Sequence, residues 1–220
     1  MKRRVTWALT AAGVGAALAA TYPLLLRDRC LHWGATPDEV IRELPGDDLI
    51  PDPDVLATRA VAVDAPPAAI WPWLVQMGSG RGGAYTYDWI ENLFGLDMHS
   101  ADRILPEYQD LKVGDVLPIG ADGPSMTVEI LEPERVLCLR AGNLEWVWTF
   151  ALYPTTDGGT RLISRNLIAT PDAPALRRLY NTLFLEPGSL VMERKMLLGI
   201  KERAERTAGD RPPAVARATG

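Results

Sequence analysis

Cysteine and histidine are scarce in this chain, which holds only two of each among its 220 residues. Two cysteines cannot form the disulfide framework of a small secreted scaffold, and no CxxC pair or Cys/His zinc spacing occurs. Aromatic residues make up 7% of the chain, charged residues 23% and hydrophobic residues 47%. Because the last two values are ordinary for globular proteins, collagen, a coiled coil and wholesale disorder are excluded.

Basic residues are too few for a protein that binds nucleic acid through its overall charge. The chain carries 23 Lys and Arg against 28 Asp and Glu, a net charge of −5. Five of those cations and only one acid lie in residues 1–29, so residues 30–220 carry 18 against 27. A body that acidic repels a phosphate backbone, so no nucleic-acid partner is expected.

Long hydrophobic runs are also rare, and the one present stands at the N-terminus. Residues 5–26 contain no charge, and as a helix they would be about 33 Å long, enough to cross a hydrocarbon core of about 30 Å. Residues 2–4 before the run are basic, and residues 27–29 after it are charged. The pattern predicts a transmembrane helix, with residues 1–29 acting as a single-pass membrane anchor.

A cleaved signal peptide is the alternative interpretation, because residues 17–19 have the small-x-small form of a cleavage site. The apolar run continues well beyond that site, which favours a retained anchor. Cations are nearly balanced on the two sides of the run, so the charge rule sets orientation only weakly. The short N-terminal tail favours a plasma-membrane protein with its domain on the extracytoplasmic side.

Residues 30–57 are predicted to form a connector between the anchor and a folded domain. Thr36 and Glu39 have the spacing of a capping box, with Pro37 at the first helical position. They predict a short helix that ends near Pro45. Residues 47–54 are rich in Asp and Pro and are predicted to be extended, solvated chain.

The next part of the chain alternates between strand and helix signals. Proline opens a helix after a first short strand, and a glycine-rich loop separates it from a second short helix. The predicted strands span residues 59–63, 116–119, 126–131, 136–141, 145–153 and 161–168, and the two short helices span residues 66–74 and 86–94.

The strand at 145–153 predicts which face of the sheet is buried. Trp146, Trp148 and Phe150 share one face, and Thr149 lies on the other. The apolar face needs a cover, which the C-terminal stretch can supply. A helix is expected from residue 172, with a break at residues 186–188 and a second section to about residue 206. The tail from residue 208 is predicted to be disordered. This order of elements is typical of an α+β domain with an antiparallel sheet.

Residues 58–67 followed by residues 70–74 resemble the opening of the SRPBCC superfamily, which includes START-like and polyketide cyclase/dehydrase-like proteins. Residues 76–103 and 192–201 are similar to a bacterial branch of it that carries an N-terminal membrane helix. The resemblance assigns residues 58–207 to one domain. It implies a helix-grip fold, in which a curved antiparallel sheet wraps round a long C-terminal helix, two short helices follow the first strand, and a hydrophobic pocket lies between sheet and helix. It transfers no catalytic residue, because the superfamily has no universal catalytic motif.

Glycine is concentrated in residues 78–83, but the context is wrong for a nucleotide-binding loop. The segment lacks the lysine and Ser/Thr that end a P-loop, and it follows a predicted helix instead of a strand. A flexible connector is the favoured interpretation, with Arg81 solvated or in contact with an anionic head group.

Glu193 is the unusual residue of the predicted C-terminal helix. A helical wheel places it inside an apolar arc, between Met196 on one side and Leu197 on the other. It is therefore predicted to be buried, where a charge needs a partner. Pairing with an arginine such as Arg103 or Arg81 is favoured over binding of a polar ligand atom.

These observations lead to a functional hypothesis of a membrane-anchored domain that binds a small hydrophobic, amphipathic or lipid-like molecule under its C-terminal helix. Aromatic residues can line such a pocket, and methionines suit an adaptable lining. No cofactor and no metal are expected. The predicted ligand-binding residues are Tyr85, Trp89, Trp146, Trp148, Met192, Glu193 and Met196.

Two other classes of function stay open. In a cyclase, dehydratase or hydrolase acting on a hydrophobic substrate, His99, Asp102 or Glu193 would be the acid/base candidates, together with Tyr87. The sequence shows no set of a nucleophile, a general base and a residue that orients the base. The spacing of Asp97, His99 and Asp102 matches no standard metal-binding signature. The third class is a membrane-associated interaction module with a filled core. The sequence leaves the oligomeric state open.

Overall fold

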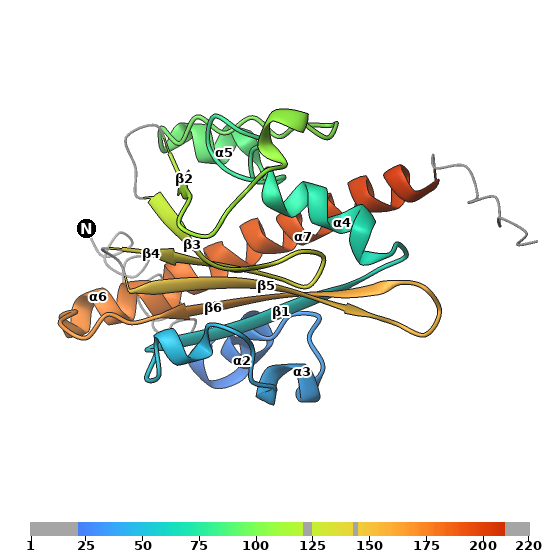
Figure 1. Ribbon diagram of the computed structural model, residues 1–220. Helices are drawn as coiled ribbons and strands as arrows, with labels where there is room; N and C mark the ends of the chain where they lie inside the picture. The colour runs from blue at the N-terminus through green and yellow to red at the C-terminus, as the bar shows by residue number, and fades with distance from the viewer. Residues whose placement is uncertain (1–21, 121–124, 143–144, 210–220) are drawn as a thin grey trace, which may run out of the picture.

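The computed structural model describes residues 22–120, 125–142 and 145–209 of the chain (Figure 1). Within those ranges, no helix is both long enough and apolar enough to cross a bilayer. Of the predicted membrane segment, only the final turn is described, as the π-helical turn η1 (Tyr22–Leu26). The remainder of that segment, and the tail from residue 210 that was predicted to be disordered, lie outside the described residues.

One curved antiparallel sheet forms the centre of the fold. Its six strands lie in the order β1-β6-β5-β4-β3-β2, and every neighbouring pair is antiparallel. A bulge between Val128 and Ile130 interrupts the register of β3 with β4. The bounds are β1 (Val55–Val63), β2 (Val116–Pro118), β3 (Ser125–Glu132), β4 (Val136–Ala141), β5 (Trp146–Pro154) and β6 (Thr160–Ile168).

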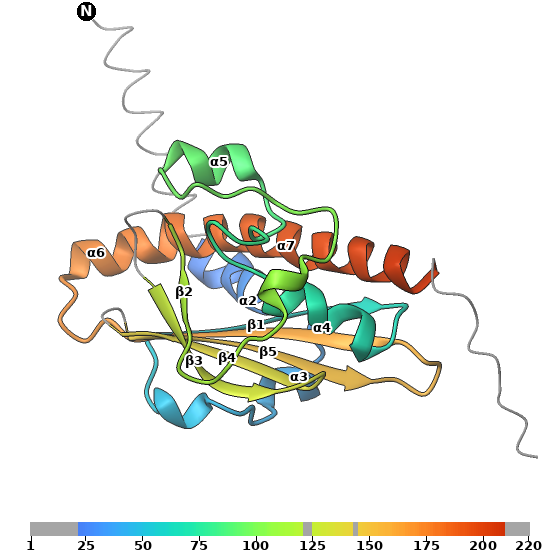
Figure 2. The same ribbon diagram turned by 45° about the horizontal axis from the view of Figure 1, so that its top comes forward.

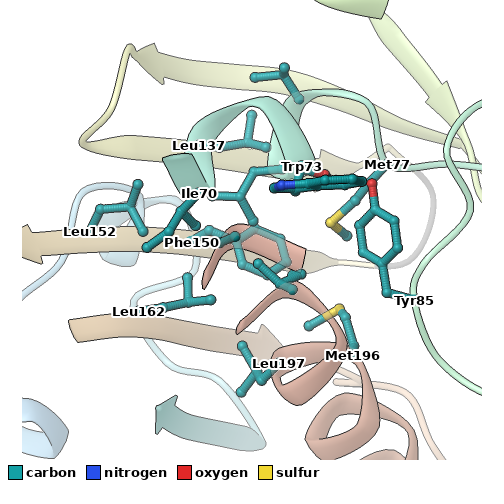
Figure 3. Close-up of a cluster of buried hydrophobic side chains, with 14 of the residues drawn as sticks. Ile70, Trp73, Met77, Tyr85, Leu137, Phe150, Leu152, Leu162, Met196 and Leu197 are labelled. Carbon is teal, nitrogen blue, oxygen red and sulfur yellow. The ribbon is translucent and has the colours of Figure 1, made fainter. Parts of the chain in front are cut away.

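The inner face of this sheet packs against the long helix α7 (Glu186–Gly209) and against α4 (Pro67–Val75). Phe150 of β5 is fully buried in this cluster, and Trp146 and Trp148 pack at its edge. Thr149, one residue away, bonds to Pro45 on the opposite side. The predicted alternation of β5 is confirmed, and Figure 3 shows strand side chains meeting Ile70 of α4 and Leu197 of α7.

The outer face of the sheet is covered by the connector, which differs from the prediction. Leu44 packs on Ala60 and Ile163, and Ile50 packs on Val136. Figure 2 shows α3 (Pro37–Ile41) on the opposite side of the sheet from α7. The predicted capping box at the start of α3 is confirmed. The prediction of solvated chain over residues 47–54 was wrong at its start, because η2 (Asp47–Leu49) packs against the sheet.

Arg165 of β6 holds the connector in place. Its guanidinium is 2% exposed and lies on the outer face of the sheet. It pairs with the Asp47 carboxylate at 2.5 Å and also donates to backbone carbonyls. A guanidinium presents five N–H donors in a fixed fork, so one side chain can satisfy several acceptors. The other acceptors are Thr58 Oγ1 and the carbonyls of Glu39, Val40 and Arg42.

The C-terminal helix is continuous where a break was predicted. α6 (Ala175–Tyr180) passes through the π-helical turn η4 (Asn181–Leu185) directly into α7. Pro187 lacks an N–H and would clash with an ordinary α-helical turn before it, whereas the wider π turn accommodates it. The break was predicted because Pro187 and Gly188 normally interrupt a helix. The sequence carries no signal of the π turn that lets the helix continue.

Candidate functional site

Glu193 and Arg59 form an ion pair in the interior of the fold. Glu193 projects from α7 with 7% of its side chain exposed, and Arg59 projects from β1 with 1% exposed. The Glu193 carboxylate accepts from Arg59 Nη1. The other guanidinium nitrogens donate to Cys30 O at 3.0 Å and Ser189 Oγ at 3.1 Å. Each of the three guanidinium nitrogens thus has a hydrogen-bond acceptor, and the buried charge has a counter-charge, as it requires.

The predicted burial of Glu193 and its pairing with an arginine are confirmed, but the predicted partners were wrong. Arg81 instead donates to the carbonyls of Val75 and Met77, at the end of α4. The sequence does carry a signal that Arg59 is buried, because it shares a strand face with the apolar residues Val61 and Val63, but not that Glu193 is its partner. An arginine on the apolar face of a strand signals a buried ion pair.

The carboxylate of Glu193 belongs to a wider hydrogen-bond network. Asn166 of β6 donates from Nδ2 to both Glu193 oxygens at 3.2 Å, and its Oδ1 accepts from Trp146 Nε1 at 2.8 Å. On the same face, Ser164 Oγ accepts from Trp148 Nε1 at 2.8 Å. Both indole N–H groups are therefore occupied within the protein, so neither is free for a ligand unless the network opens.

Burial raises the pKa of the Glu193 carboxyl above its ordinary value. The positive charge of Arg59 acts in the opposite direction, and hydrogen bonding from Ser164 and Arg59 also favours the charged form. Protonation of Glu193 would leave the Arg59 guanidinium buried without its counter-charge. The pair therefore acts as one unit.

An apolar cavity lies beside this network. Its volume is about 50 Å³, far below the roughly 300–1,000 Å³ of ordinary ligand pockets. Trp148 connects the two features, because its ring lines the cavity while its N–H bonds to Ser164. The other lining residues are Met77, Gly78, Ala84, Met98, Leu117, Pro118, Ile119, Met126 and Leu139.

Of the predicted ligand-binding residues, Trp148 is the one that lines this cavity. Trp146 stacks on it with ring centroids 5.6 Å apart. Met196 is buried in the main core, and Met192 is half-buried on α7. Trp89 lies on α5 (Asp88–Leu93) with 71% of its surface exposed.

Tyr85 is a core residue in the structure. Its hydroxyl donates to Trp73 O at 2.9 Å, and the two rings meet edge to face (Figure 3). Burial raises the pKa of Tyr85. Its backbone lies so close to α7 that a Cβ at Gly199 would come within 2.6 Å of Tyr85 O. Tyr85 therefore fixes the loop against the helix.

The acid/base candidates do not converge. His99 is exposed and contacts Asp97 at 3.1 Å, while Asp102 pairs with Arg203 at 2.8 Å. Glu193 is occupied by Arg59. Tyr87 lies under Lys195, whose Nζ is 5.9 Å from the ring centroid. Over the described ranges no group of three His, Cys, Asp or Glu side chains is placed to hold a metal ion.

The glycine-rich loop is closed by hydrogen bonds, which differs from the predicted flexible connector. Gly78 and Gly83 form a two-way backbone bridge, and Ser79 N donates to Pro118 O at 3.0 Å. Gly83 has φ 71°, and a Cβ there would come within 2.7 Å of the His99 backbone. The loop therefore forms a firm wall of the cavity, and glycine is needed for the close approach.

No protein-family model matches the chain, and no curated protein matches it in sequence. Among solved structures, the KanY protein is 18% identical, with a TM-score of 0.45 over 69% of this chain and 97% of its own.

Two further solved structures are similar at the same level. A protein of Mesorhizobium loti is 19% identical, with a TM-score of 0.42 over 70% of this chain and 98% of its own. A Polyketide_cyc-like protein from Corynebacterium glutamicum is 13% identical, with a TM-score of 0.33 over 70% and 88%. At these values the ligand has to be inferred from the residues of this chain.

Proposed function

We propose that this domain binds a small hydrophobic or amphipathic molecule between its sheet and α7, and that residues 5–26 hold it at a membrane. The observation that carries the proposal is the apolar cavity that Trp148 shares with the Glu193 network. The cavity offers apolar surface, and the network offers polar groups at its edge. Most small-molecule sites combine these two features.

The cavity must enlarge to admit such a ligand, and its lining supports that. Three methionines, Met77, Met98 and Met126, border it. Methionine is unbranched and has three rotatable bonds, so it repacks around a guest at low cost. Wall residues from the hydrogen-bonded glycine loop, such as Gly78, stay in place. We infer that a ligand enters by displacing methionine side chains while the backbone frame is retained.

Filling the cavity with protein atoms tests this proposal. We expect Ala84→Leu to weaken binding of a fluorescent fatty acid, 11-(dansylamino)undecanoic acid, by about tenfold, which is about 1.4 kcal/mol. The larger leucine side chain at position 84 would occupy the space that the probe needs. The measurement is a fluorescence titration of the full chain, with thermal unfolding recorded because overpacking can also destabilise by about 1–3 kcal/mol.

The matched control is Ala62→Leu, which makes the same change at an exposed position of β1. It should bind the probe as the parent chain does. Equal affinity in Ala84→Leu and Ala62→Leu would contradict the assignment of this cavity as the binding site. Mass spectrometry of gently extracted protein would then be the independent check for a co-purifying ligand.

An interaction module with a filled core is the second candidate, and the small size of the cavity favours it. About 50 Å³ is empty beside an otherwise closely packed core. If the parent chain binds no probe and carries no small molecule on extraction, this second candidate is supported over ligand binding.

A further inference from the structure

The α6–η4 face is an apolar surface at one end of the molecule, formed by Leu176, Leu179, Tyr180, Phe184 and Leu185. These side chains are between 51% and 78% exposed. The spacing of the first four is that of one stripe along a helix. Tyr180 and Phe184 stack at 5.5 Å. The stripe was predicted to cover the sheet, but α6 extends past the end of the sheet, as Figures 1 and 2 show.

The same end of the molecule holds η1, the last turn of the uncharged run. η1 lies against η4, and its Leu24, Leu25 and Leu26 are also exposed. Arg27, the first charge after the run, pairs with Glu186 at the start of α7, and Tyr22 donates to the same carboxylate at 3.1 Å. These contacts fix the end of the run beside η4, so the exposed leucines of η1 adjoin the α6–η4 face.

The charge and shape of this surface point to a lipid occupant. An open hollow of about 580 Å³ runs along α6, lined by Leu176, Tyr180 and Leu185 among others, and the exposed Arg177 stands at its edge. A cation beside an apolar stripe is typical of helices that lie in the interface of an anionic bilayer. Aromatic side chains such as Tyr180 favour that same layer.

We propose that the α6–η4 face docks into the interfacial layer of a bilayer that contains anionic phospholipid. This inference rests on the proposed anchoring of the chain by residues 5–26. In this arrangement η1 marks the point where the chain leaves the bilayer, and α6 lies along its surface. The domain is then held by two contacts, which fix its orientation, whereas a single flexible tether would leave it free to rotate.

Fluorescent labelling tests this proposal on the full chain. Cys30 and Cys138 are both buried, so one exposed cysteine can be labelled selectively with the dye NBD. Leu179→Cys and Phe184→Cys report on the α6–η4 face. Thr156→Cys, in the exposed turn between β5 and β6, is the matched control at the far end of the molecule. Each protein is placed in vesicles of phosphatidylcholine and phosphatidylglycerol that contain nitroxide-labelled lipid.

Labels at positions 179 and 184 should emit at shorter wavelength and be quenched by the nitroxide lipid at least about threefold more than the label at 156. The reason is that an interfacial helix buries its apolar face about 5–10 Å into the headgroup and acyl boundary. Blue-shifted emission without lipid quenching would overturn the proposal, because protein instead of lipid would then cover the face. Emission equal to that at position 156 would also overturn it.

A label at Leu25→Cys separates this inference from the anchoring on which it rests. Strong quenching at 25 with none at 179 and 184 means that the anchor holds and the α6–η4 face stays in water, which refutes only the docking. No quenching at 25, 179 or 184 refutes both the anchoring and the docking.

Discussion

Arg165→Ala is expected to lower the free energy of unfolding by about 3–5 kcal/mol. The substitution removes the partner of the Asp47 carboxylate. It also leaves the buried carbonyl of Glu39 and the part-buried carbonyls of Val40 and Arg42 without this donor. Each orphaned acceptor costs free energy because it lost its water on folding. The connector would then lose its attachment to the outer face of the sheet, and Leu44 and Ile50 would be exposed with it.

Urea unfolding of the full chain, followed by circular dichroism, measures this effect. Arg135→Ala is the matched control, because Arg135 is 76% exposed and pairs with Glu132 on the surface. Exposed pairs contribute only about 0–1 kcal/mol. Arg165→Lys should fall between the two, since an ammonium keeps the charge but cannot form the five-donor fork. If Arg165→Ala costs no more than Arg135→Ala, the connector is held by something else.

Glu193→Gln is expected to destabilise the fold by about 3–5 kcal/mol at neutral pH. The amide has the shape of the carboxylate but no charge, so the Arg59 guanidinium would be buried without a counter-ion. Thermal or urea unfolding measures the change. A near-zero effect would mean that the carboxyl is already protonated in the folded protein, which is the direction in which burial shifts its pKa.

The double variant Arg59→Met with Glu193→Gln is the control that isolates the pair. Removing both charges takes away the stranded guanidinium, and apolar replacements of buried pairs are often tolerated. We expect the double variant to be more stable than Glu193→Gln alone, with a coupling of at least about 1 kcal/mol. Additive effects of the two changes would contradict a direct ion pair between Arg59 and Glu193.

Local periodicity predicted the elements of this fold and their faces. The alternation of Trp146, Trp148 and Phe150 identified the face of β5 that meets the main core, while Val147 and Ala151 make the opposite face buried as well. The helical wheel placed Glu193 inside the apolar side of α7. Both predictions depend only on residues a few positions apart, where the geometry of a strand or helix is regular. The α+β architecture, with an antiparallel sheet and a long C-terminal helix, followed from their order.

The cover of the outer face was missed because its sequence resembles solvated chain. Residues 47–54 are rich in Asp and Pro, which normally indicates a loop in water. Arg165 changes their environment by binding Asp47 and the carbonyls around it. Its position between Ile163 and Leu167 on the outer strand face carried a signal, since those apolar neighbours indicate that the face is buried.

The sequence by itself determined that Glu193 is buried, that Trp146, Trp148 and Phe150 share one face of β5, and that an uncharged run precedes the domain. Tertiary structure alone decided which arginine meets Glu193, how far the core fills the space under α7, and that the stripe on α6 stays uncovered. Arg59 and Glu193 are 134 positions apart, so their meeting depends on strand order and on where α7 crosses the sheet. Periodicity sets the face on which a residue lies, and only the packing of whole elements sets what lies opposite it.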